Sequence, residues 1–79
     1  MIYIVASERR QADTVARWLE CAPTEYEYVA DTRGFDGRPR GTVIFFGNWR
    51  RRPDWETLPA RARACGHVLL KLEDDRYGV

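Results

Sequence analysis

The sequence is poor in the residues that most often hold metals or carry catalysis. Among its 79 residues are one histidine, His67, and two cysteines, Cys21 and Cys65. One histidine without a cysteine pair does not make a zinc site of the usual kind. The two cysteines fall in predicted helices without paired spacing, so we expect reduced, buried thiols rather than a disulfide. Ser7 has no base nearby and suits a helix N-cap better than a nucleophile.

Phosphate-binding motifs and long apolar runs are absent as well. The chain has no G-x-x-x-x-G-K-[ST] sequence, and the turn at residues 6–9 contains no glycine, so the P-loop and the dinucleotide fingerprint are both excluded. The longest apolar runs, residues 2–6 and 43–46, are far shorter than the roughly 20 residues that span a bilayer. No basic leader precedes an apolar stretch, so we expect no signal peptide. The sequence therefore predicts a cytoplasmic protein with no membrane partner, no metal and no cofactor.

What remains is an ordinary globular composition with an unusual choice of basic residue. The chain is 44% hydrophobic and 32% charged, which predicts one folded domain over residues 1–79 with a polar C-terminal tail at 73–79. The net charge is only +1, yet twelve of the thirteen basic residues are arginine. Codon usage in a G+C-rich genome explains the abundance of arginine but not its placement.

Hydrophobic periodicity predicts strands at residues 2–6, 26–30, 42–46 and 67–72. A first helix is predicted to follow Ser7 as N-cap and to end before Pro23, and residues 31–41 form a loop with room for one helical turn. A second helix ends at Gly66 and begins either after Asp54 or nearer Thr57, because Pro59 lacks the amide that a helix interior needs.

The order of these elements predicts a small α/β fold, β-α-β-β-α-β. Crossover helices imply mainly parallel strands with right-handed connections. The first and third strands are the most apolar and belong in the centre, so the predicted order of the four-stranded sheet is 2-1-3-4. This is half of a Rossmann-like or flavodoxin-like sheet.

Arginines cluster where three of the predicted strands end. In open parallel sheets ligands bind beyond the carboxyl ends of the strands, where the winding reverses, and here that crevice lies between the first and third strands. Helix N-termini and arginines at this rim favour anions, and a tryptophan beside them can stack a base. The predicted anion- or nucleotide-binding residues are Ser7, Arg9, Arg10, Arg33, Asn48, Trp49, Arg50, Arg51 and Arg52. The alternative is that Glu8, Asp31, Asp54 or the acidic tail neutralises these arginines.

The three tryptophans receive different predictions. Trp18 and Trp55 lie on or near the apolar stripes of the two helices, so we expect both in the core. Trp49 follows a turn and precedes Arg50. Its position fits either a lid over the crevice or part of a partner interface.

Three stretches of the chain are similar to small accessory proteins encoded by actinobacteriophages, mycobacteriophages among them. They are residues 2–12 (IYIVASERRQA), 47–54 (GNWRRRPD) and 62–68 (ARACGHV). The resemblance implies a phage accessory protein in the cytoplasm of a bacterial host. It transfers no functional residue.

Three functions remain open. The first is a non-enzymatic interaction protein that binds a host protein or forms a homodimer, for example through an edge strand such as residues 26–30. The second is an anion-binding module for a nucleotide or nucleic acid at the arginine rim. An enzyme acting on a phosphorylated small molecule ranks last, because the crevice supplies no general base.

Overall fold

The computed structural model describes residues 1–72, and the predicted polar tail at 73–79 lies outside the described residues. The described residues form four strands, two α-helices and two short 3-10 helices. In order these are β1 (Ile2–Val5), α1 (Arg9–Trp18), β2 (Tyr26–Tyr28), η1 (Thr32–Phe35), β3 (Thr42–Phe46), η2 (Trp49–Arg51), α2 (Thr57–Ala64) and β4 (Val68–Leu72).

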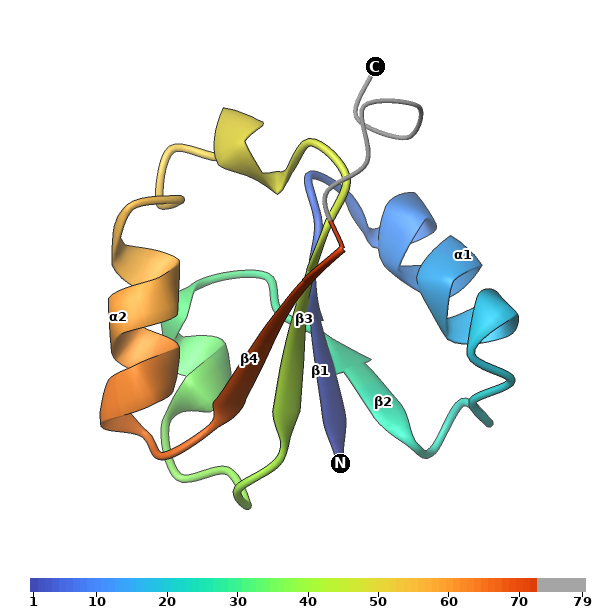
Figure 1. Ribbon diagram of the computed structural model, residues 1–79, viewed down its shortest axis with the longest axis horizontal. Coiled ribbons are helices and arrows are strands. Elements are labelled where there is room, and N and C mark those ends of the chain that lie inside the picture. Colours follow the sequence, from blue (N-terminus) through green and yellow to red (C-terminus); the bar gives the residue numbers. More distant parts are fainter. Residues whose placement is uncertain (73–79) are drawn as a thin grey trace.

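The four strands form one parallel sheet in the order β2-β1-β3-β4. The α/β class and the strand order predicted from the sequence are therefore confirmed. Helix α1 lies on one side of the sheet, while α2 and η1 lie on the other (Figure 1). Because β1 and β3 occupy the centre, their carboxyl ends meet at the edge from which α1 and η2 depart.

The two central strands supply both hydrophobic cores, since successive side chains of a strand point to opposite faces. Tyr3, Val43 and Phe45 point toward α2 and η1, where they pack with Phe35 and Leu58. The opposite core lies under α1 and consists of Ile4, Ala12, Val15, Ala16, Ile44 and Phe46. This double burial is why both strands have nearly continuous apolar sequences.

Two helix boundaries differ in how well the sequence predicted them. Helix α2 begins at Thr57, the later of the two predicted starts, so Pro59 sits in the first turn, where an amide has no intrahelical partner. Gly66 ends it with a φ of 84°. The predicted N-cap Ser7 is wrong: the N-cap of α1 is Glu8 and no side chain caps it. The Ser7 hydroxyl donates to the Gln11 side chain instead.

Candidate functional site

A chain of polar side chains links the segments that follow β1 and β3, where the sequence predicts the crevice. Ser7 donates from both its backbone N–H and its hydroxyl to Gln11 Oε1, at 3.2 and 2.9 Å. Gln11 Nε2 in turn donates to Asn48 Oδ1 at 2.8 Å. The structure thus brings Ser7 and Asn48 together, but through the amide of a residue that the sequence analysis did not single out. These side chains are half-buried and bonded to one another.

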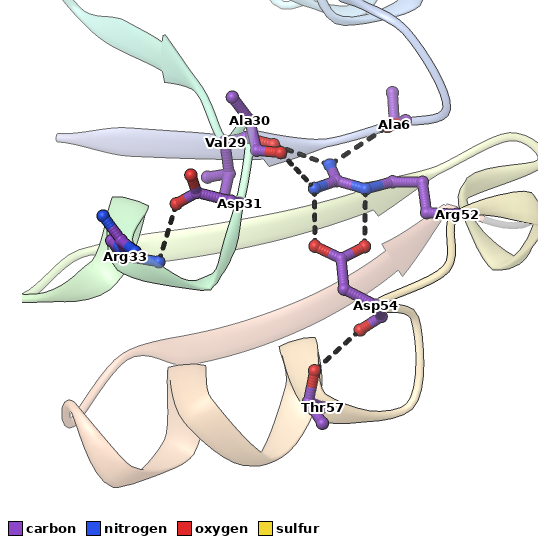
Figure 2. A network of polar contacts seen from close by, with 8 residues as sticks. All are labelled: Ala6, Val29, Ala30, Asp31, Arg33, Arg52, Asp54 and Thr57. Carbon is purple, nitrogen blue, oxygen red and sulfur yellow. Dashed lines mark hydrogen bonds and ion pairs between the residues drawn. The ribbon is translucent and has the colours of Figure 1, made fainter.

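Arg52 is the most deeply embedded of the predicted site residues. Only 7% of it is exposed, and its guanidinium reaches under the carboxyl ends of β1 and β2 (Figure 2). Nη1 donates to the carbonyl oxygens of Val29 and Ala6, at 2.6 and 3.3 Å. Nη2 donates to the Ala30 carbonyl at 2.7 Å. Asp54 completes the set, because its carboxylate accepts from Nε and Nη2 at 3.0 and 2.9 Å.

These contacts use the whole donor capacity of Arg52. A guanidinium has five N–H groups, and here each of them points to its own acceptor. An external anion could bind Arg52 only by displacing Asp54 or a strand-end carbonyl. Asp54 therefore neutralises Arg52, which is the alternative that the sequence analysis stated for this aspartate.

The local sequence explains why Arg52 differs from the two arginines before it. Arg50 and Arg51 belong to η2, whereas Arg52 precedes Pro53 and adopts an extended backbone with φ −70° and ψ 143°. A residue before proline is driven out of helical conformations by the proline ring. The change in direction turns Arg52 inward, under the sheet edge.

The other predicted arginines reach different parts of the surface. Arg9 lines a groove along β2, together with Tyr26 and Arg38. Arg33 lines a second groove on the other side of the sheet, between η1 and α2, where Arg61 pairs with Asp36. Arg50 lies over the ring of Trp49, 5.4 Å from its centroid, and Arg10 and Arg51 are exposed. The two grooves therefore hold Arg9 and Arg33 separately rather than together.

Hydrogen bonding and nearby charge perturb one ionisable side chain at the β2 groove. The Tyr26 hydroxyl donates to Asp13 Oδ1 at 3.0 Å. This bond is the main reason that the pKa of Tyr26 is raised above its usual value, with burial and the charge of Asp13 adding to it and Arg9 and Arg17 opposing. The groove thus has cationic groups on the α1 side and the Arg38–Glu27 ion pair, at 2.9 Å, on the other.

The tryptophans reverse the sequence-based expectations. Trp49 is 1% exposed and packs on Phe45 with ring centroids 4.6 Å apart, so its side chain belongs to the core rather than to the surface. Trp18 and Trp55, predicted in the core, are 53% and 37% exposed. The 3-10 turn η2 brings Trp49 back over the end of β3, which leaves Trp55 at the periphery of the same core. Trp18 packs on Phe46 in a T-shaped arrangement with ring centroids 5.5 Å apart, and about half of its surface stays exposed.

Strand β4 carries the clearest exposed apolar feature. Leu69 packs into the core beneath α2, so Val68 and Leu70 point to the α1 side of the sheet. Helix α1 packs against β2 and β3. Within residues 1–72 no element covers β4 on that side, so Val68 is 64% and Leu70 50% exposed. The sequence analysis placed this strand at the edge of the sheet but made no prediction about which of its side chains are exposed. The exposure could have been expected from the number of helices, because two helices are too few to cover both faces of a four-stranded sheet.

The remaining candidate groups do not form a reactive site. Cys21 and Cys65 are free thiols, as predicted, but both are half-buried rather than buried. His67 is buried, and its Nδ1 accepts from the Gly41 N–H at 3.1 Å. Over the described part of the chain, no three histidine, cysteine, aspartate or glutamate side chains are grouped to hold a metal ion.

Comparisons with known proteins add no family to this description. No protein-family model, curated protein or solved structure matches the chain. In residues 1–72 there is no helix of the length and apolar character needed to cross a membrane.

Proposed function

We propose that this protein is a non-enzymatic interaction module that binds another folded protein through strand β4. The observation that carries the proposal is the exposure of Val68 and Leu70 at the edge of an all-parallel sheet. Parallel strands are normally covered on both faces, and exposed edge strands pair readily with other chains. We call the outer edge of β4 together with the side chains of Val68 and Leu70 the β4 surface.

The proposal also names a biological setting. A phage accessory role in a bacterial cytoplasm follows from the sequence resemblance alone.

The alternative function, an anion-binding module, has weaker support than the sequence suggested. Arg52 is fully bonded inside the protein, and Arg9 and Arg33 line separate grooves. The exposed side chains of Arg10 and Arg51 favour it.

A photo-crosslinker placed on the β4 surface tests the proposal. Benzoylphenylalanine replaces Leu70 in one variant and the exposed Thr24, before β2, in a matched control. Both are expressed in actinobacterial cells and irradiated. We expect the variant at position 70 to form an adduct with one defined protein, identified by mass spectrometry, and the control to form none. Equal labelling from both positions, or none from position 70, contradicts the proposal.

A further inference from the structure

The geometry points to a second copy of this chain as the partner of the β4 surface. In the arrangement that we propose, the β4 strands of the two copies pair antiparallel about a twofold axis at Leu70, and the two sheets become one. This inference rests on the proposed function, because it names the occupant of the same surface. It replaces the dimer through residues 26–30 that the sequence suggested, since β2 is only three residues long and β4 has five.

Backbone hydrogen bonding determines which groups of β4 face outward. The Val68 N–H donates to the Gly41 carbonyl at 3.0 Å, so the backbone of Val68 points to β3. Neighbouring residues of a strand direct their N–H and C=O groups to opposite sides. The backbone groups of Leu69 and Lys71 therefore face away from the sheet. These are the groups that an added strand bonds.

The position of these groups selects the register. An axis at Leu70 pairs all five residues of β4 and places Leu69 opposite Lys71 of the second copy. Each such pair exchanges both of its hydrogen bonds in an antiparallel ladder. An axis at Lys71 would instead put two lysines directly opposite each other, which is unfavourable. The register centred on Leu70 is thus the most extensive one without facing like charges.

The side chains of β4 suit this register. Leu70 meets Leu70 of the second copy in a non-hydrogen-bonded pair, where the Cα atoms approach to about 4.5 Å and side chains touch. Val68 flanks this contact on the same face, so two half-exposed apolar side chains of each copy lose exposed area. Lys71 points to the other face of the sheet, where its long apolar stem can lie along the neighbouring strand while its ammonium stays in water.

The contact is small, and interfaces of this size are typical of weak complexes. One five-residue strand with two apolar side chains buries on the order of 400 Å² per copy, about half of what a standard stable interface buries. We therefore expect a weak dimer, with a dissociation constant of about 10 μM or above. Sedimentation velocity at concentrations on both sides of this value should show monomer and dimer in exchange.

Cysteine substitution tests the register directly. With the axis at Leu70, two Leu70→Cys residues have Cα atoms within the range that a disulfide requires. Two Val68→Cys residues are separated by about four residues of strand, roughly 13 Å, which is too far. After oxidation with oxidised glutathione, we expect a disulfide-linked dimer of Leu70→Cys and a monomer of Val68→Cys, although position 68 is the more exposed. The parent chain, with Cys21 and Cys65, controls for the native thiols.

Proline at position 71 provides a second, independent test. The Lys71 N–H faces outward, so Lys71→Pro removes a donor of the proposed dimer but none of the ladder with β3. Proline is tolerated at such edge positions. We expect loss of the dimer in Lys71→Pro and its retention in the matched control Lys71→Thr, with circular dichroism showing both variants folded.

The results separate this inference from the proposed function. Dimers of Leu70→Cys with monomers of Val68→Cys and Lys71→Pro support pairing of two copies. Equal crosslinking at positions 68 and 70, no crosslinking at either, or a Lys71→Pro dimer as strong as that of Lys71→Thr overturns it. If the photo-crosslinker at position 70 captures a different protein only, the second copy is excluded while the proposed function stands.

Discussion

Arg52 and Asp54 flank Pro53 and form a bidentate ion pair, in which Nε and Nη2 of the arginine donate to separate oxygens of the carboxylate. The same guanidinium holds the carbonyls at the ends of β1 and β2. One buried side chain thus joins two strand ends to the segment that leads into α2. In a domain this small, with a correspondingly limited core, such a connection matters to stability.

Replacing Arg52 by lysine should destabilise the fold. Lysine keeps the charge but has three donors on one nitrogen, so some of the five contacts are lost and buried acceptors remain unpaired. We expect Arg52→Lys to reduce the free energy of unfolding by about 3 kcal/mol, and the exposed control Arg51→Lys to change it by less than about 0.5 kcal/mol. Urea denaturation measures both. Equal midpoints for the two variants would show that the buried contacts of Arg52 do not stabilise the fold.

Glycine 41 should tolerate no side chain. A Cβ atom there would collide with the Met1 carbonyl oxygen, and both backbone groups of Gly41 are bonded, to His67 and Val68. Gly37 has a φ of 66° but open space around it. We expect Gly41→Ala to lower the free energy of unfolding by more than about 2 kcal/mol and Gly37→Ala by about 1 kcal/mol. Thermal or urea unfolding that ranks the two variants in the opposite order contradicts the packing at the start of β3.

Stability should fall in alkali partly through Tyr26. Its hydrogen bond to Asp13 raises the pKa of Tyr26 above the usual value near 10. The folded chain therefore holds this proton more tightly than the unfolded chain, so the contribution is complete below about pH 10 and is lost as the pH rises through the folded-state pKa. We expect Tyr26→Phe, and to a smaller extent Asp13→Asn, to flatten the pH dependence of the urea midpoint above pH 10. An unchanged slope in Tyr26→Phe would contradict the assignment.

Binding of single-stranded DNA distinguishes the alternative function. Each phosphate contact on a single strand contributes about −0.7 to the log–log slope of affinity against salt. Since Arg52 is bonded internally and Arg9 and Arg33 lie apart, we expect a slope corresponding to about one contact or none in fluorescence anisotropy. A steep slope that is lost in the double variant Arg10→Ala/Arg51→Ala would instead favour an anion-binding module.

The sheet could be predicted from the sequence because a strand that is buried on both faces has a nearly continuous apolar sequence. The continuous apolar stretches of β1 and β3 indicated central strands, and the helices between strands indicated parallel pairing. Pro59 restricted where α2 can begin, and Gly66 marked where it ends, for backbone reasons that do not depend on tertiary contacts. These features are local, so the order β2-β1-β3-β4 followed from them.

The side chains at the sheet edge were harder to predict because their direction depends on short turns. Arg50, Arg51 and Arg52 are alike in sequence, and only Pro53 signalled that the third would turn inward. The sequence analysis predicted Trp49 at the surface because nothing in the sequence showed that a single 3-10 turn brings its ring back onto Phe45. The exposure of Leu70 reflects an absent covering element, which no residue of β4 itself encodes.

The all-parallel sheet also determines how the chain can reach this structure. Ile2 pairs with Tyr26 and Thr42 with Val68, so even the nearest partners are about 24 residues apart. Within residues 1–72 the sheet therefore contains no hairpin that could form early. Every strand contact must wait for the closure of a long loop, and such non-local topologies fold slowly for their size. We expect refolding on the millisecond timescale or slower, with unpaired strand edges exposed until the last crossover closes.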